Sequence, residues 1–198
     1  MNQLSATPAT SRLLSALAAT LVLSLTLSDV HATTIEEKSF DDMSAEADMI
    51  FVGTVEDVHS EWVAEEGGPI ETLVTFSALE WIRGNAHDEL TLRFSGGEMN
   101  DIAERLPGMP RFSVGDRIAV FANEGQQASP IVGFNQGAFQ IIETSAGSNV
   151  VDVYGRSARC KIEPASCPSS LPGALETVPA MGLSEFVDAV RARVNTAH

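Results

Sequence analysis

The chain has 198 residues, of which 44% are hydrophobic, and 27 acidic against 12 basic residues give it a formal net charge of −15 at pH 7. This length and composition suit a single globular domain. The negative field that such a charge creates repels nucleic acid and anionic lipid, so neither is an expected partner. We interpret the acidity as a source of solubility, with an acidic recognition surface as the alternative.

An export signal is expected at the start of the chain. Residues 13–27 form an apolar run without charge, preceded by Arg12 and followed by Val30-His31-Ala32. The run is shorter than the roughly 20 apolar residues that span a membrane, and Val30 and Ala32 are the small residues that precede a cleavage site. We therefore expect residues 1–32 to be a signal peptide cleaved after Ala32, with an uncleaved anchor helix as the alternative.

The mature chain, residues 33–198, is then expected to be one secreted or periplasmic domain without stable membrane insertion. Its first elements are a short helix and a long strand. Ser39, followed three residues later by Asp42, has the form of a capping box that begins the helix. Residues 47–58 are apolar and β-branched, which predicts the first core strand, and Gly53 marks a point where that strand bends.

Alternating apolar and polar residues predict strands over residues 70–82 and 90–95. Further strands are expected over residues 117–122, 131–143 and 150–154. A polar turn cluster at 65–69 joins the first two strands into a long hairpin. The fifth strand is interrupted at Asn135-Gln136-Gly137, where we expect a bulge or a tight turn.

Helical spacing appears in two later stretches. Apolar residues recur at this spacing over residues 99–106, which predicts a short helix between the third and fourth strands. Residues 155–182 are rich in Pro, Ser and Ala and are expected to be coil. Residues 183–195 predict an amphipathic helix whose apolar face docks on the sheet, with partner binding as the alternative.

Taken together, this order predicts a mainly β fold. We expect a five- to six-stranded Greek-key barrel of the OB type, with a short N-terminal helix, a short helix between strands 3 and 4, and a C-terminal amphipathic helix.

Three short motifs carry a family resemblance. They are Ala47-Asp48-x-Ile50-Phe51-x-Gly53-x-Val55, the strand 76–81 that ends on Arg83-Gly84, and Phe112-x-Val114-Gly115-Asp116 before a strand. Over residues 47–142 the chain resembles the OB-fold domains of tissue inhibitors of metalloproteinases and netrin modules, and related exported bacterial proteins. The resemblance implies a fold rather than an activity.

The resemblance also marks a departure from those inhibitors. They chelate the zinc of the protease through an amino-terminal cysteine, whereas the mature chain is expected to begin Thr33-Thr34-Ile35-Glu36. No inhibitory residue is therefore assigned here.

Few residues point to chemistry. The sequence contains no nucleophile elbow, zinc helix, phosphate loop or EF-hand loop, so we expect no catalytic residue, metal or cofactor. Cys160 and Cys167 are expected to form a disulfide in an oxidising compartment, because two thiols alone do not complete a zinc site. Trp62 beside an acidic turn, and the polar pair Asn135 and Gln136, are the candidates for a binding surface.

These observations favour an exported, non-enzymatic module that binds or modulates another exported protein. Inhibition of a secreted metalloprotease and a carboxylate-dependent hydrolase are the alternatives.

Overall fold

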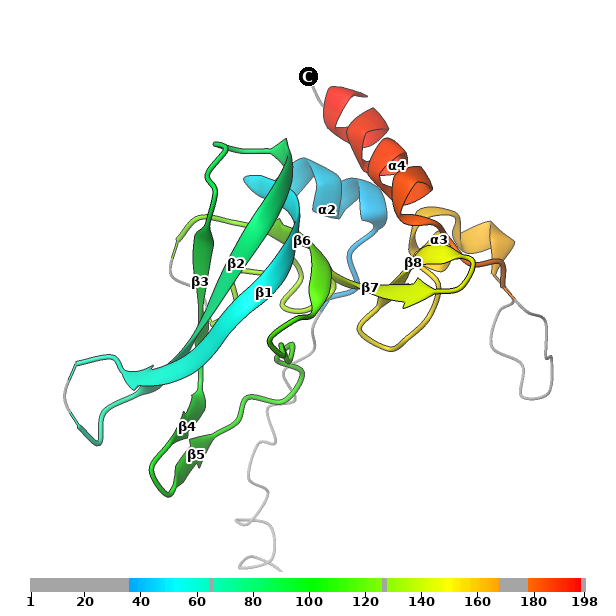
Figure 1. The fold of residues 1–198 in the computed structure, drawn as a ribbon. Helices are drawn as coiled ribbons and strands as arrows, with labels where there is room; N and C mark the ends of the chain where they lie inside the picture. The colour runs from blue at the N-terminus through cyan, green and yellow to red at the C-terminus, as the bar shows by residue number, and fades with distance from the viewer. Residues whose placement is uncertain (1–35, 65, 126–127, 168–177, 197–198) are drawn as a thin grey trace, which may run out of the picture. The chain divides into compact units, whose positions relative to one another are not determined.

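The computed structural model describes residues 36–64, 66–125, 128–167 and 178–196. In these residues, six strands form one antiparallel sheet in the order β3-β2-β1-β6-β7-β8, and two more form a small sheet, β4-β5 (Figure 1). The strands are β1 (Met49–Trp62), β2 (Ile70–Arg83), β3 (Leu90–Ser95), β4 (Gly97–Met99), β5 (Ile102–Glu104), β6 (Arg117–Ala122), β7 (Ala138–Thr144) and β8 (Gly147–Asp152). The helices are α2 (Phe40–Glu46), α3 (Arg159–Ile162) and α4 (Leu183–Thr196), with a 3₁₀ turn η1 (Pro164–Ser166).

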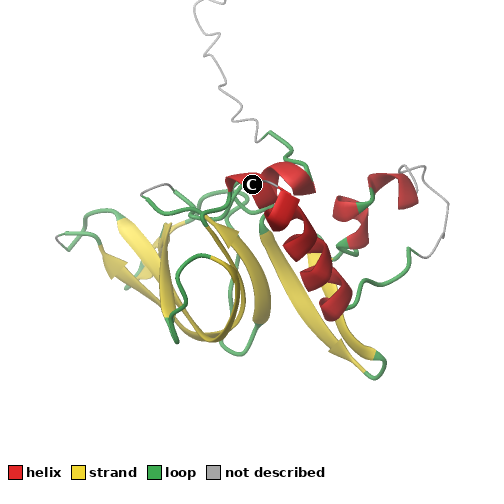
Figure 2. Ribbon diagram, turned by 90° about the horizontal axis from the view of Figure 1, so that it is seen from above, coloured by secondary structure: helices red, strands yellow, loops and turns green. Residues whose placement is uncertain are grey.

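The mainly β expectation is confirmed, but the described strands do not close into a barrel. β3 and β8 are the two edge strands of the larger sheet. Near the edge at β3, the described backbone makes one hydrogen bond, from the N–H of Ser95 to the carbonyl of Ala128 at 2.8 Å. The sheet is strongly curved, and α4 lies beside its β7–β8 part (Figure 2).

β1 and β6 separate two hydrophobic clusters, which explains why β1 begins as a continuous apolar run. Alternate residues of the two strands face opposite sides: Ile50, Val52, Ala119 and Phe121 join one cluster, and Phe51, Val55, Ile118 and Val120 join the other. The first cluster also takes the apolar faces of α2 and α4, and the second lies against β2 and β3. A strand buried on both faces loses the usual alternation with polar residues.

The two longer helices begin and dock as expected. Ser39 caps α2 by accepting a hydrogen bond from the N–H of Asp42 at 3.0 Å, and the Asp42 carboxylate completes the capping box. Phe186 of α4 is fully buried, and its ring lies 5.1 Å from that of Phe139 and 5.9 Å from that of Phe40. The apolar face of α4 is therefore part of the core.

The expected helix at residues 99–106 is wrong. The chain forms the β4-β5 hairpin there instead. Gly96 and Gly97 have φ of +87° and +154°, and Asn100 in the connecting turn has φ of +52°, so the backbone turns where a helix would continue. Ile102 is one of the apolar residues at helical spacing, and it remains 48% exposed. The spacing therefore does not mark a face that packs on the core.

The expected coil at 155–182 is also wrong in part, because α3 and η1 lie within it. Cys160 and Cys167 form the predicted disulfide, and it ties these two elements together. Arg159 of α3 pairs with Glu185 of α4 at 2.7 Å, and Pro164 occupies the first position of η1, which favours a helical turn. Residues 168–177 of the expected coil lie outside the described residues.

Smaller differences concern where strands begin and end. The interruption in the expected fifth strand is real, since β7 starts at Ala138 and Ile131 makes only an isolated bridge to Ala122. The pairing of β1 with β2 shifts register between Val52 and Thr54, which places an irregularity at Gly53. A Cβ at Gly53 would lie 2.7 Å from a methyl carbon of Leu79.

All described residues belong to one compact unit, Ile35–His198. The predicted signal peptide, residues 1–32, lies outside the described residues. Within the described part of the chain, no helix is both long and apolar enough to cross a membrane.

Candidate ligand-binding pocket around Asn135

A strained turn before β7 carries the candidate site. The N–H of Asn135 donates to the carbonyl of Gly133 at 2.9 Å, and Phe134 between them has φ of +71°. A three-residue turn with positive φ at its centre is rare and strained, especially at an aromatic residue. Ser129, itself buried, accepts from the N–H of Ile131 and donates to the carbonyl of Phe134 at 2.6 Å, which holds the turn in place.

This turn places Asn135 against Gly108, which lies in the segment that precedes β6. Asn135 is only 8% exposed, and its Nδ2 donates to the carbonyl of Gly108 at 2.9 Å. Its Oδ1 has no hydrogen-bond partner among the described residues, although the side chain lines a cavity. This oxygen is not a fully buried atom, so water or a ligand can reach it and donate a hydrogen bond to it.

The cavity has a volume of about 340 Å³ and lies between the turn, α3 and the loop after β8. Its lining combines polar side chains with apolar surface and consists of Glu37, Gly108, Asn135, Gln136, Phe139, Asp152, Val153, Tyr154, Arg156 and Lys161. A second cavity of about 280 Å³ shares Gly108, Asn135, Val153 and Tyr154 with it. We call the first cavity the Asn135 pocket and the second the adjoining cavity.

The charges in the Asn135 pocket are balanced. Lys161 Nζ lies 3.3 Å from the Glu37 carboxylate and 3.3 Å from Gln136 Oε1, and Arg156 lies 2.7 Å from the Asp152 carboxylate. The two cations of the lining therefore face its two anions.

Asp152 shapes the loop that carries Tyr154 and Arg156. Its Oδ1 accepts hydrogen bonds from the N–H groups of both residues, each at 2.9 Å, and its Oδ2 accepts from Arg156 Nε at 2.7 Å. The Arg156 guanidinium lies over the Tyr154 ring, 5.2 Å from its centre. Tyr154 is nevertheless 71% exposed, so an aromatic ring is presented at the mouth of the pocket.

The structure brings two of the three sequence-predicted binding residues together. Asn135 and Gln136 line the Asn135 pocket, while Trp62 lies at the end of β1 in the long hairpin and does not line it. Gln136 has a structural role. Its Oε1 accepts a hydrogen bond from the N–H of Lys38 at 2.9 Å, and its Nε2 donates to the carbonyl of Glu36 at 2.8 Å. These bonds hold the segment that leads into α2.

Sequence reasoning missed Tyr154, Arg156 and Lys161. Tyr154 was expected at the end of a strand, and the other two in coil. For Tyr154 and Arg156, the only signal is that they follow Asp152 by two and four residues, a spacing that allows the Asp152 side chain to cap a loop. No local pattern points to Lys161.

A larger cavity of about 600 Å³ also borders Gly108. Several of its polar groups have partners within the chain: Thr72 donates to the carbonyl of Gly96 at 2.7 Å, and Glu104 accepts from the N–H of Ile70 at 3.2 Å. Arg105 at its rim pairs with Glu98 at 3.3 Å. No described residue that lines this cavity has a fully buried polar side-chain atom without a hydrogen-bond partner.

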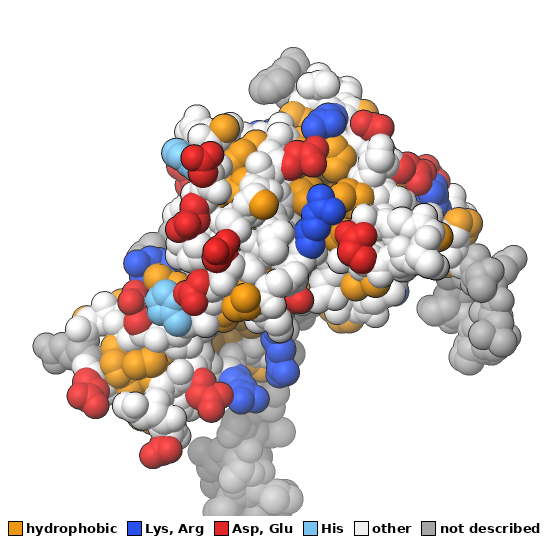
Figure 3. Space-filling model, in the orientation of Figure 1, with side chains coloured by type: hydrophobic (Ala, Val, Ile, Leu, Met, Phe, Trp, Pro, Cys, Tyr) orange, Lys and Arg blue, Asp and Glu red, His pale blue; other side chains and the backbone are white. Residues whose placement is uncertain are grey.

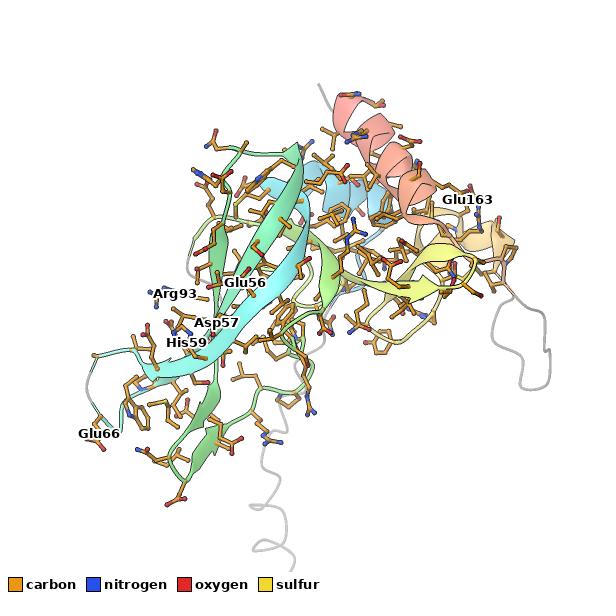
Figure 4. The ribbon with its side chains drawn as sticks, viewed as in Figure 1. Glu56, Asp57, His59, Glu66, Arg93 and Glu163 are labelled. Atoms are coloured by element: carbon orange, nitrogen blue, oxygen red, sulfur yellow. A yellow bond between two sulfur atoms is a disulfide. The ribbon has the colours of Figure 1, made fainter. Side chains whose placement is uncertain are left out.

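Charged residues elsewhere form exposed pairs rather than a catalytic group. Asp57 and His59 of β1 lie near Arg93 of β3, and Glu163 lies far from them (Figure 4). The Arg93 guanidinium donates to the Glu61 and Glu71 carboxylates, at 2.9 and 3.4 Å, and these bonds raise the pKa of Arg93. Among the described residues, no three His, Cys, Asp or Glu side chains are grouped as a metal site.

Acidic side chains are spread in small groups over the face in Figure 3, with Lys and Arg side chains between them. On this face, the acidity accords better with solubility than with one concentrated recognition surface.

No family model, curated protein or solved structure matches this chain.

Proposed function

We propose that the protein is an exported, non-enzymatic binding module and that the Asn135 pocket is its ligand site. The observation that carries this proposal is the Oδ1 of Asn135, which accepts no hydrogen bond from the described residues and which a strained turn holds at the wall of the cavity. Strain of this kind persists where the surrounding structure enforces it, and it is often found at ligand sites. Ligand binding would modulate the interaction of this module with another exported protein.

Export is part of the proposal. It is supported by the uncharged apolar run at residues 13–27 and by the disulfide between Cys160 and Cys167, which suits an oxidising compartment. Amino-terminal sequencing of the protein from the periplasm or medium should begin at Thr33. Recovery of the whole protein in the cytoplasmic fraction would contradict export.

We also propose that β1, β2, β3, β6 and β7 correspond to the five strands of an OB-like barrel related to netrin modules. Supporting this are the meander β1-β2-β3, the pairing of β1 with β6, and the bond between Ser95 and Ala128 at the β3 edge. The proposal concerns the fold, and no protease-inhibiting residue is assigned from it.

A hydrolase is the second candidate, because Glu37 and Asp152 line the same pocket. Each is already paired with a cation, Glu37 with Lys161 and Asp152 with Arg156, so neither carboxylate is free to act on a substrate. The pocket therefore suits binding better than carboxylate catalysis.

The test is a thermal-shift screen of the full chain against small polar metabolites of neutral, anionic and cationic classes. We expect at least one class to raise the melting temperature of the native chain and of Asp188→Ala, a change on the exposed face of α4. The same class should not stabilise Asn135→Leu, which fills the space of the amide without its acceptor. No stabilisation by any class, or turnover of a compound, would overturn the proposal.

A further inference from the structure

We infer that the ligand of the Asn135 pocket is a neutral saccharide, an inference that rests on the binding function proposed above. Three features of the pocket lead to this class: its balanced charge, its accessible acceptor at Asn135 and its exposed aromatic ring.

Balanced charge excludes a strongly charged ligand. The two cations of the lining are paired with its two anions, Lys161 with Glu37 and Arg156 with Asp152, so the pocket presents no net charge to a ligand. Lys161 and Asp152 are the more buried partners, with side chains 14% and 12% exposed, whereas Glu37 and Arg156 also contact solvent. A neutral ligand leaves both pairs intact.

The Asn135 acceptor can take a donor from the ligand. Asn135 Oδ1 can accept an O–H or N–H, and the amide nitrogen of the same side chain is already bound to Gly108. Lys161 keeps a third N–H beyond those directed at Glu37 and Gln136, and this N–H can donate to a ligand oxygen. A hydroxyl both donates and accepts, so it satisfies the two groups together.

The exposed ring of Tyr154 is the third feature that points to a saccharide. An aromatic face is electron-rich and attracts the polarised C–H groups on the flat side of a sugar ring, while hydroxyls at the ring's edge remain free for hydrogen bonds. Asp152 fixes the loop that presents this ring, and Arg156 flanks it at 5.2 Å. Tyr154 thus provides a fixed platform beside the polar lining.

Cavity size favours a short saccharide. The Asn135 pocket, at about 340 Å³, is near the lower end of the range for small-molecule sites. The adjoining cavity of about 280 Å³ shares both Asn135 and Tyr154 with it, so a second sugar unit can continue from the first.

Isothermal titration calorimetry on the full chain tests this inference. The probes are glucose, galactose, mannose, N-acetylglucosamine and their disaccharides, with glucuronate, glucosamine and glycylglycine as charged or zwitterionic comparisons. We expect at least one neutral saccharide to bind, and a disaccharide to bind more tightly than its monosaccharide. Asn135→Leu should weaken binding about tenfold or more, because the hydrogen bond from the ligand to Oδ1 is lost.

Two variants of the exposed tyrosine keep the test valid if Asn135→Leu folds poorly. Tyr154→Ala should weaken binding about tenfold, whereas Tyr154→Phe, which keeps the ring, should stay within about threefold of the native chain. Binding of only the charged probes, or saccharide binding that Tyr154→Ala leaves unchanged, would overturn the saccharide inference. Such charged-ligand binding, if lost in Asn135→Leu, would leave the proposed binding function standing.

Discussion

At the scale of single residues, the turn from Gly133 to Gly137 depends on close backbone contacts. A Cβ at Gly137 would lie 2.9 Å from the carbonyl oxygen of Phe121, which is a backbone atom and cannot rotate away. At Gly53, the corresponding contact at 2.7 Å is with the end of the Leu79 side chain, which can move. The same added methyl group should therefore have different costs at the two glycines.

We predict that Gly137→Ala lowers the free energy of unfolding by about 3 kcal/mol and Gly53→Ala by about 1 kcal/mol, within the usual range for overpacking. Urea denaturation of both variants measures the difference. Equal losses would show that the backbone near Phe121 relaxes as easily as the Leu79 side chain does.

Another residue-scale prediction concerns Asp42 in the capping box. Hydrogen bonds from the Ser39 hydroxyl and then from the Ser39 N–H lower the pKa of Asp42 below its ordinary value of 3.8. The folded chain therefore holds this proton less tightly than the unfolded chain does. The stabilisation is complete above pH 3.8 and is lost as the pH falls through the lowered pKa.

The measurement is the melting temperature of the native chain and of Asp42→Asn between pH 7 and pH 2. We expect the native chain to melt at the higher temperature near neutral pH and the gap to close towards pH 2. A gap of constant size throughout would mean that the ionised carboxylate adds nothing to the cap.

At the scale of elements, alternation in the sequence predicted β2 and β3, because one face of each strand meets the core, whereas β6 is an apolar run buried on both faces. The same reasoning failed for β4 and β5, since spacing alone cannot show that Ile102 has no core to contact. It failed for α3 as well, because that helix is held by partners distant in sequence, such as Glu185. Tertiary contacts override local pattern in both places.

Our element-scale prediction concerns α4. Phe186 is fully buried against three other aromatic rings, whereas Asp188 is exposed on the opposite face. Phe186→Ala should cost about 4 kcal/mol and Asp188→Ala less than about 0.5 kcal/mol. Chemical denaturation compares the two. Similar small losses would indicate that α4 is not docked on the sheet and is free to bind a partner.

At the scale of the whole molecule, the candidate site is assembled from segments that no local pattern links. Asn135 and Gln136 could be predicted as a polar island between apolar residues. Tyr154, Arg156 and Lys161 could not, because they reach the pocket through the β7-β8 hairpin and through α3. Trp62 was a reasonable candidate by composition, but the long hairpin carries it away from the pocket.

The pocket can be observed directly because Tyr154 is the chain's single tyrosine. In the full chain with ring-labelled tyrosine, NMR signals from that ring report on the mouth of the pocket alone. Titration with the metabolite and saccharide panel should move these signals saturably for a compound that binds, and Asn135→Leu should remove the effect. Tyrosine signals that stay fixed while calorimetry detects binding would place the ligand elsewhere and contradict the Asn135 pocket as the site.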